Sequence, residues 1–320
     1  MRRKILITGG TGFLGTHLTA HLSRCGHSVF AVGRDSGDLL SLLEADQVVN
    51  EIEPEIIIHA AADCGGIGYN QEKKSQLFSA NLRMGLNMID AARTMDTLRL
   101  LINVGSTCAY PVDAPVPIHE DSLHRGLPEE TNRPYGLAKR MVHYYGDLLR
   151  RTENFPFVTA QLANLYGPED TFDERRSHVI PALIRRIYEA KSSGLPSVTI
   201  WGSGNATRDF LYVQDAAGGI DRIISHDPLP EESIFNLGSC REISIRDLTS
   251  EICRQLGYSG EIEFDPSKPD GQPRRLLDCS EAQQALGYQP TYSLEAGLAE
   301  TIEWYIAHRR ERDALEEKVL

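Results

Sequence analysis

The sequence predicts an α/β protein in which a doubly wound parallel sheet is followed by a smaller C-terminal α/β domain. Short runs rich in β-branched residues alternate with longer helical stretches through the first half of the chain, which implies right-handed crossovers and therefore parallel strands. A glycine-rich loop separates the first run from the first helical stretch. After about residue 163, Pro and Gly interrupt the alternation more often, as expected where a second domain begins.

Apolar runs are expected to form the strands of the main sheet, in chain order over residues 4–8, 28–33, 55–61, 98–104 and 157–162. Between these runs, the helical spacing of apolar residues predicts helices over 13–24 and 77–95. Residues 209–239 are expected to form a strand and a helix that return to the main sheet. The predicted domains are residues 1–162 plus about 209–240, and residues 163–208 plus 241–320.

Composition and charge exclude several classes of protein. The formal net charge of −12 disfavours a nucleic-acid partner, and no apolar run approaches the roughly 20 residues that cross a membrane. The apolar part of "MRRKILITGG" stops at Thr8, which is too short for a signal peptide. The six cysteines show no CxxC pair. We therefore expect a cytoplasmic protein with reduced thiols and no metal site.

The first loop, in "ILITGGTGFLG", has the glycine spacing of a dinucleotide-binding Rossmann fold. Glycines permit a tight turn there and let a pyrophosphate lie on the N-terminus of the following helix. The expected cofactor-binding residues of this loop are Gly9, Gly10, Thr11, Gly12, Phe13, Leu14 and Gly15.

The end of the second strand indicates which dinucleotide the loop would hold. An acidic residue there binds the adenosine ribose of NAD, whereas an Arg accommodates the 2′-phosphate of NADP. In "VFAVGRDS" the strand ends at Gly33 and Arg34, and Asp35 comes late. This arrangement favours NADP(H), the alternative being that Arg34 points into solvent.

Tyr135 and Lys139 lie four residues apart in "RPYGLAKR", on one face of a helix that begins near Pro134. A neighbouring ammonium group and an oxidised nicotinamide would stabilise the phenolate, so that Tyr135 could exchange a proton with a carbonyl oxygen. Ser106 is expected at the end of the fourth strand. A chance YxxxK on an ordinary helix is the alternative interpretation.

The chain resembles the extended short-chain dehydrogenase/reductases. The resemblance extends from about residue 60 to 278 and depends on "AADCGGIG", "GSTCAYP", "RPYGLAKR", "NLYGPEDTFDERRSHVIPALIRR", "WGSGNATRDFLYV" and "FDPSKPDGQPRRLLD". It implies an NADP-binding Rossmann domain, a nucleotide-sugar substrate domain, and a homodimer that packs through helices near 72–95 and 134–151.

Within that family, the chain is similar to the members that epimerise and reduce a GDP-4-keto-6-deoxy sugar, with GDP-L-fucose as the implied product. By this resemblance, Cys108 and His178 exchange protons at the carbons beside the ketone, since their ordinary pKa values, near 8.5 and 6.5, lie on either side of neutrality. Ser106 and Tyr135 polarise the C4 oxygen, and NADPH supplies hydride to C4.

The same resemblance implies further binding residues. Leu162, Ala163, Asn164 and Leu165, together with Lys139 and His178, would lie along the cofactor. Contacts to the GDP-sugar are expected from Arg186, Trp201, Arg208 and Asp270. Arginine forks suit a diphosphate, and a carboxylate accepts hydrogen bonds from sugar or base groups.

Several alternatives stay open from the sequence. Thr11 stands where some relatives have an arginine, and "LANLYG" and "GNATRDF" differ from the usual family segments. A related GDP-4-keto-deoxy sugar or a GDP-heptose could therefore be the substrate, and the enzyme could be a 4-reductase alone. A GDP-mannose 3,5-epimerase would have lysine in place of His178. A non-catalytic NADP-binding sensor is the remaining interpretation.

Overall fold

The structure, a computed structural model, describes residues 2–317. Its larger part is built on a six-stranded, wholly parallel sheet with the strand order β2-β1-β3-β4-β5-β9. The strands are β1 (Lys4–Thr8), β2 (Ser28–Val32), β3 (Ile56–His59), β4 (Leu100–Ser106), β5 (Phe157–Leu162) and β9 (Ile234–Leu237). The predicted parallel sheet is confirmed, and the five predicted strands lie within two residues of their observed bounds at each end.

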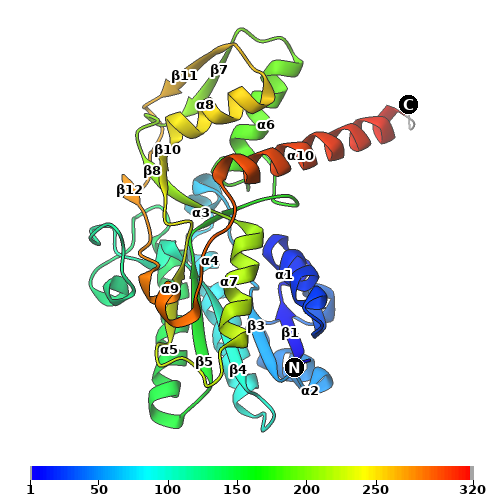
Figure 1. Ribbon diagram of the computed structural model, residues 1–320, viewed down its shortest axis with the longest axis vertical. Coiled ribbons are helices and arrows are strands. Elements are labelled where there is room, and N and C mark those ends of the chain that lie inside the picture. The colour runs from blue at the N-terminus through cyan, green and yellow to red at the C-terminus, as the bar shows by residue number, and fades with distance from the viewer. Residues whose placement is uncertain (1, 318–320) are drawn as a thin grey trace.

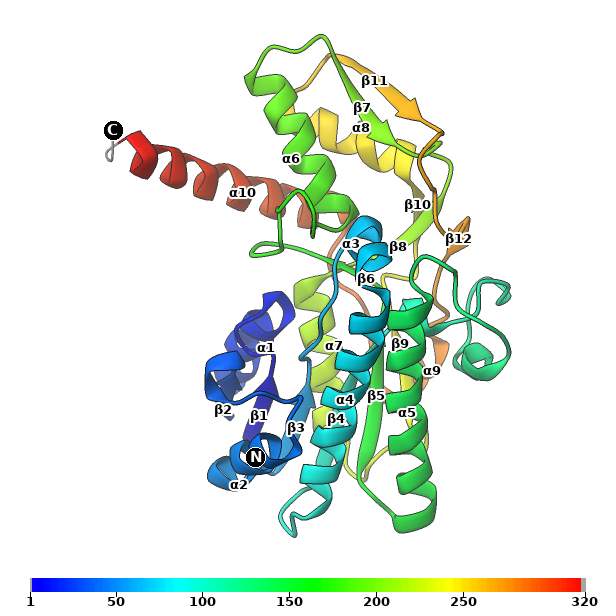
Figure 2. The same ribbon diagram turned by 180° about the vertical axis from the view of Figure 1, so that it is seen from behind.

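Helices cover both faces of this sheet. On one face lie α1 (Phe13–Arg24) and α7 (Val213–Ser225), and on the other lie α2 (Leu42–Ile52), α4 (Lys74–Arg93) and α5 (Arg133–Glu153) (Figures 1 and 2). Alternate residues of β1 point to the two layers, because Ile5 and Ile7 join the core under α1 and Leu6 joins the core under α4. Central strands buried on both faces explain the nearly continuous apolar runs in the sequence.

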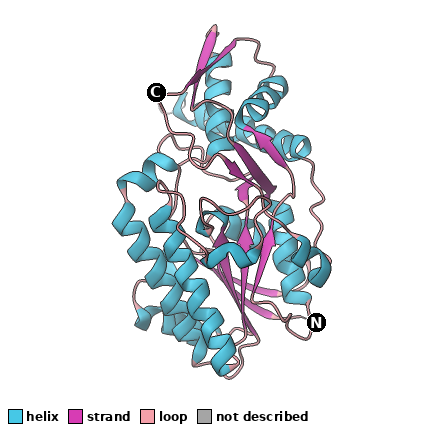
Figure 3. Ribbon diagram, turned by 90° about the vertical axis from the view of Figure 1, so that its left-hand side faces the viewer, coloured by secondary structure: helices cyan, strands magenta, loops and turns pink. Residues whose placement is uncertain are grey.

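The smaller part of the molecule lies beyond the carboxyl edge of the main sheet (Figure 3). One of its sheets contains β6 (Asn164–Tyr166), β8 (Thr207–Tyr212), β10 (Glu242–Ser244) and β12 (Arg274–Arg275), and β7 (Ser197–Trp201) pairs with β11 (Glu261–Asp265). Its helices are α6 (Val179–Ser192), α8 (Ile245–Leu256) and α10 (Leu294–Glu317). A third core unites these elements, with Ile184, Phe210 and Leu248 at its centre.

Shorter elements connect these parts of the chain: η1 (Arg34–Ser36), α3 (Ile67–Glu72), η2 (Thr107–Ala109), η3 (Glu120–His124) and α9 (Ser280–Leu286). Among the described residues, no helix has the length and hydrophobicity needed to cross a membrane.

One expectation for residues 209–239 needs correction. The helix α7 packs on the main sheet and β9 joins that sheet, but the predicted strand, β8, does not. It pairs instead with β6, β10 and β12. The physical reason is burial, because Phe210 and Tyr212 pack into the third core rather than against the main sheet.

Two helical glycines allow a matched test of this packing. A Cβ at Gly146 of α5 would overlap the ring of Phe157 on β5, whereas a Cβ at Gly218 of α7 would meet open space. We predict that Gly146→Ala lowers the free energy of unfolding by about 1–3 kcal/mol. Gly218→Ala should raise it by about 0.5–1 kcal/mol through helix propensity alone. Urea unfolding of both variants measures the difference, and equal effects would contradict the packing of α5 on β5.

Candidate active site

The candidate site begins where β4 ends, at Ser106. The Ser106 Oγ accepts a hydrogen bond from the backbone N–H of Cys108 (3.2 Å), which starts the short helix η2 immediately after the strand. Residue 108 therefore lies at the carboxyl edge of the parallel sheet, where ligands bind in open α/β folds. Because the turn is short, the side chains of Ser106 and Cys108 both lie at this edge.

Tyr135 and Lys139 project from the first turns of α5, which has Pro134 near its start as expected. The Lys139 side chain is buried, and its Nζ donates a hydrogen bond to the carbonyl oxygen of Val104 (3.0 Å). Burial lowers the pKa of Lys139 to about 8, although the nearby Cys64 opposes this change. The lysine is thus anchored to the strand that carries Ser106.

The environment of Tyr135 keeps its phenol protonated. Burial raises the pKa of Tyr135 well above its ordinary value, the thiols of Cys64 and Cys108 raise it further, and a hydrogen bond with Ser106 lowers it. The sequence predicted a stabilised phenolate, which requires both a lysine and an oxidised nicotinamide. The protein by itself does the opposite, because burial outweighs the hydrogen bond, and so it holds Tyr135 in the form that donates a proton.

Cys108 is in contact with a residue from the far end of the chain. The Arg275 guanidinium lies 3.5 Å from the Cys108 sulfur and is itself held by Gln272 through two hydrogen bonds. Arg275 belongs to β12, and β12 is placed by its parallel pairing with β8. The sheet that contains β8 and β12 therefore places a cation beside the thiol at the end of β4.

His178 stands at the N-cap of α6, and its side chain makes no capping hydrogen bond there. His178 as a whole residue is exposed, yet the protein atoms packed around its ring lower the His178 pKa by desolvation. A neutral imidazole is therefore favoured at neutral pH. Its side chain remains free of the helix it caps.

The segment before His178 is clamped to the loop after β3. Gly66 N–H donates to the Arg176 carbonyl (3.1 Å), and the Arg176 guanidinium lies 3.4 Å from the Asp63 carboxylate. Tyr69 donates to the same carboxylate (2.9 Å) and lies under the Arg176 guanidinium. Cys64 in this loop raises the pKa of Tyr135, and the Cys108 thiol in turn raises the pKa of Cys64. The loop therefore connects the region of the sheet edge to the start of α6.

The glycine loop fits the pyrophosphate of a dinucleotide. Gly9 has a φ of +68° and its carbonyl accepts from Gly12 N–H (3.0 Å). A Cβ at Gly15 would overlap the Gly9 carbonyl oxygen, and a Cβ at Gly10 would lie 2.6 Å from that of Ala31. Gly12 caps α1 without a side chain, which leaves the first N–H groups of the helix available to an anion.

The end of β2 fits NADP better than NAD. A Cβ at Gly33 would lie 2.7 Å from Thr11 Oγ1, so the acidic side chain that reads the ribose of NAD has no room at this position. Arg34 is exposed at the start of η1. Its charge acts to lower the pKa of Tyr69, against the larger effect of burial. Within the described part of the chain, Arg34 forms no salt bridge.

The predicted substrate-binding residues form two groups. Arg208 is buried and donates to the carbonyl oxygens of Gln272 (2.6 Å) and Asp270 (2.9 Å), close to Cys108. Arg186 lies over the ring of Trp201, with 5.1 Å between guanidinium carbon and ring centroid, and Lys268 lies over the same ring. Trp201 is 53% exposed. An exposed aromatic ring with two cations close to it is suited to a planar base and its phosphates.

Asp270, which is predicted to contact the GDP-sugar, makes hydrogen bonds within the protein. Its two carboxylate oxygens accept from the Ser203 backbone N–H (2.7 Å) and from the Ser203 hydroxyl (2.8 Å). The carboxylate therefore holds the turn after β7, which includes Gly202 at a φ of +88°.

Along the expected cofactor path, Leu162 ends β5, Ala163 follows, and Asn164 and Leu165 open β6. The Asn164 amide donates to the Asp209 carbonyl (3.1 Å), which joins β6 to β8.

The sequence did not single out Cys64, Asp63, Arg176 or Arg275 as parts of the site. A signal existed, since Asp63 and Cys64 lie in "AADCGGIG" and Arg275 in "KPDGQPRR". Their contacts join segments more than 100 residues apart, so spacing along the chain does not reveal them.

Known proteins resemble this chain in sequence and in fold. A family model described as "NAD dependent epimerase/dehydratase family" matches residues 5–238. The GDP-L-fucose synthase of Sinorhizobium fredii is 38% identical over 306 residues, covering 96% of both chains. A solved GDP-L-fucose synthetase from Naegleria fowleri bound to NADP has a TM-score of 0.85 and 27% identity, covering 96% of this chain and 94% of that one. A solved GDP-6-OMe-4-keto-L-xylo-heptose reductase from C. jejuni has a TM-score of 0.86 and 26% identity, covering 96% and 98%.

Burial of the Lys139 ammonium group should lower the free energy of unfolding, although the site needs this charge. Because the pKa of Lys139 falls from 10.5 to about 8 in the folded state, the cost of burying its charge is full below pH 8 and declines as pH rises toward 10.5. Lys139→Met should therefore raise the free energy of unfolding at pH 7 by about 1–3 kcal/mol, with a smaller gain at pH 10.

Urea unfolding at the two pH values measures this effect. Lys191→Met is the matched control, because Lys191 also donates to a carbonyl oxygen, that of Leu256 (2.6 Å), but is exposed. If Lys139→Met is less stable than the parent at pH 7, the hydrogen bond to Val104 outweighs the desolvation of the ammonium group.

Proposed function

The chain belongs to the NAD dependent epimerase/dehydratase family, and from this premise we propose that it converts GDP-4-keto-6-deoxy-D-mannose to GDP-L-fucose with NADPH. The reaction would invert C3 and C5 of the sugar and reduce the ketone at C4. Relatives named GDP-L-fucose synthase match nearly the whole chain. The observation that carries the proposal is the thiol of Cys108 beside Ser106 and Tyr135, because reduction alone requires no thiol there.

The C4 oxygen of the sugar would bind between Ser106 and Tyr135. Both side chains lie at the end of β4 and the start of α5, and the Tyr135 phenol is held protonated by its surroundings. A protonated phenol donates a hydrogen bond to the ketone and stabilises negative charge that develops on its oxygen. The neighbouring Lys139 ammonium, anchored to Val104, would favour the phenolate left after Tyr135 gives up its proton.

Inversion at C3 and C5 needs a base on one face of the sugar and an acid on the other. We assign these roles to His178 and Cys108, which approach from different parts of the fold, the N-terminus of α6 and the end of β4. The lowered pKa of His178 keeps the imidazole neutral and able to accept a proton. Removal of the proton beside the ketone places its electron pair on the C4 oxygen, and the second group then returns a proton to the opposite face.

NADPH, when bound, supplies the hydride that reduces C4. The glycine loop from Gly9 to Gly15 would hold its pyrophosphate, and Lys139 and Asn164 would lie near its nicotinamide end. Gly33 and Arg34 would accept the 2′-phosphate, since the contact of Gly33 with Thr11 leaves no room for an acidic reader of NAD. The NADP bound in the Naegleria fowleri relative supports this assignment.

The GDP part of the substrate would extend across the smaller part of the molecule. Arg208 and Arg275 would lie near the sugar and diphosphate, and Arg186, Trp201 and Lys268 near the nucleotide. Asp270 would act there by holding the turn at Ser203. Two groups of cations explain how a protein with a net charge of −12 binds an anion.

We also propose that the enzyme acts as a homodimer. Met141, Tyr144 and Leu148 leave between 37% and 47% of their surface exposed along one face of α5, and Phe78 does the same on the neighbouring α4. This apolar stripe lies at helical spacing and suits a second copy of the chain. The expected cytoplasmic location stays a prediction.

A second candidate is reduction of a GDP-keto-heptose, because the C. jejuni heptose reductase matches the fold as closely as the Naegleria fowleri enzyme does. Simple 4-reduction would make Cys108 dispensable, and the following experiment separates the two functions.

Incubation with GDP-4-keto-6-deoxy-D-mannose and NADPH in heavy water should give GDP-L-fucose that carries solvent deuterium at C3 and C5, as read by NMR. We predict that Cys108→Ser or His178→Gln lowers the rate of this conversion at least about 100-fold, because each removes one proton carrier. Cys240→Ser, a half-buried thiol outside the site, is the matched control. NADPH consumption without deuterium at carbon would leave only a reductase.

The cofactor assignment has its own prediction. Arg34→Ala should raise KM for NADPH at least about 10-fold while leaving KM for NADH unchanged, because a charged hydrogen bond to phosphate contributes about 1.5–3 kcal/mol. Steady-state kinetics with the two cofactors measure the change in preference. Arg254→Ala, an exposed arginine on α8, should change neither value. An unchanged preference in Arg34→Ala would show that Arg34 faces solvent.

A further inference from the structure

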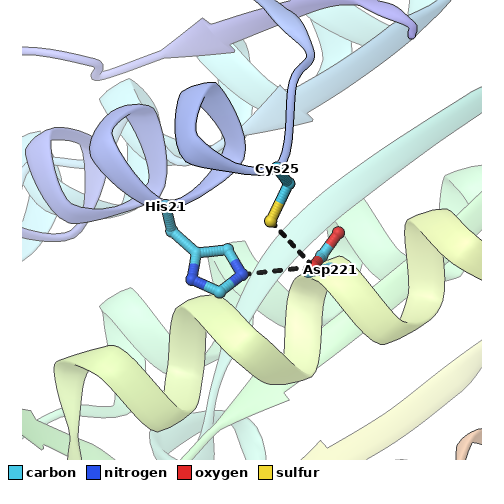
Figure 4. A group of neighbouring side chains, drawn as sticks. All are labelled: His21, Cys25 and Asp221. Carbon is cyan, nitrogen blue, oxygen red and sulfur yellow. Dashed lines mark hydrogen bonds and ion pairs between the residues drawn. The ribbon is translucent and has the colours of Figure 1, made fainter. Parts of the chain in front are cut away.

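A cluster of three side chains with metal-ligating atoms lies outside the candidate active site. His21 is in the last turn of α1, Cys25 is the residue that ends this helix, and Asp221 lies in the middle of α7. Figure 4 shows the His21 ring and the Cys25 sulfur both pointing toward the Asp221 carboxylate. His21 and Cys25 share one face of α1 because they lie four residues apart.

The distances within this cluster suit a single metal ion. His21 Nε2 lies 3.1 Å and Cys25 Sγ 3.5 Å from the same oxygen, Asp221 Oδ2, and the three ligating atoms all lie within 4.8 Å of one another. Bonds of about 2.0–2.3 Å to tetrahedral zinc place neighbouring ligand atoms roughly 3.3–3.6 Å apart. Two edges of the tetrahedron are thus nearly formed by the side chains as they stand.

We propose that His21, Cys25 and Asp221 form a zinc site that joins α1 to α7. A thiolate with an imidazole is a donor set typical of Zn²⁺, whereas Ca²⁺ and Mg²⁺ prefer oxygen ligands throughout. Zn²⁺ binds the thiolate and the neutral imidazole, so the proton of the Cys25 thiol is released to solvent, and the His21 ring keeps its one N–H proton on Nδ1. Water completes the fourth position, because the cluster is partly exposed.

The position of the site points to a structural role. α1 carries the glycine loop at its first turn and the cluster at its last, about 18 Å away at 1.5 Å per residue. α7 packs against α1 on the same face of the sheet. An ion shared by the two helices would stabilise the folded state in proportion to its binding and would not touch the reacting sugar.

The experiment uses the full chain after removal of metal by a chelator. Titration with ZnCl₂ against a chromophoric chelator should give one tight site per chain at His21, Cys25 and Asp221, and saturation should raise Tm by about 4 °C. Replacement with Co²⁺ should produce the near-ultraviolet absorption of a thiolate-bound cobalt.

The variants decide where the ion binds. Cys25→Ser and His21→Gln should each weaken zinc binding at least about 10-fold and abolish the Tm rise, and Cys25→Ser should also remove the cobalt–thiolate band. Because Cys108 is a second partly exposed thiol, the titration is repeated on Cys108→Ser, in which the site and the band should persist. Circular dichroism confirms that each variant is folded.

Two results overturn the proposal. The first is no binding of Zn²⁺ to the parent chain beyond that of an equal concentration of Mg²⁺. The second is binding that survives in Cys25→Ser and disappears in Cys108→Ser, which would assign the metal to the catalytic thiol.

Discussion

Six strands that run in one direction place the ends of β1, β2, β4 and β5 at a single edge, and the glycine loop and the residues around Ser106 start from that edge. The glycine loop follows β1, Gly33 and Arg34 follow β2, and Ser106 ends β4. Parallel strands require this arrangement, because each crossover helix returns the chain to the opposite edge before the next strand begins. The topology of the sheet alone therefore brings these residues to one edge, whatever contacts their side chains make.

The edge of the sheet is completed by contacts from the smaller part of the molecule. Arg275 reaches Cys108 from β12, Asn164 ties β6 to β8, and Arg176 is held by Asp63 at the approach to α6. These contacts are polar and lie between the core of the main sheet and the core of the smaller part. A small movement of one part relative to the other would therefore change their lengths. A site built in this way suits a long substrate, since its sugar and its nucleotide can bind to different elements.

Buried charge is the energetic cost of this arrangement. Lys139 and Arg208 are both buried, and burial lowers their pKa values to about 8 and about 10. Asp209 is buried as well, and its pKa rises to about 6 despite hydrogen bonds from Ser239. Groups of this kind are retained at functional sites although apolar residues would be more stable there.

The sequence by itself determined the local features of this protein. The strands, the glycine loop, the helix with Tyr135 and Lys139, and the pair Ser106 and Cys108 depend on periodicity and turn chemistry within a few residues, and segment resemblance pointed to the right family. Tertiary structure alone decided that Arg275 meets Cys108, that Cys64 adjoins Tyr135, that Asp270 holds Ser203, and that β8 leaves the main sheet. The reason is physical: such contacts arise when separately formed elements pack to bury their apolar faces, and no pattern within one segment records which distant segment will cover it.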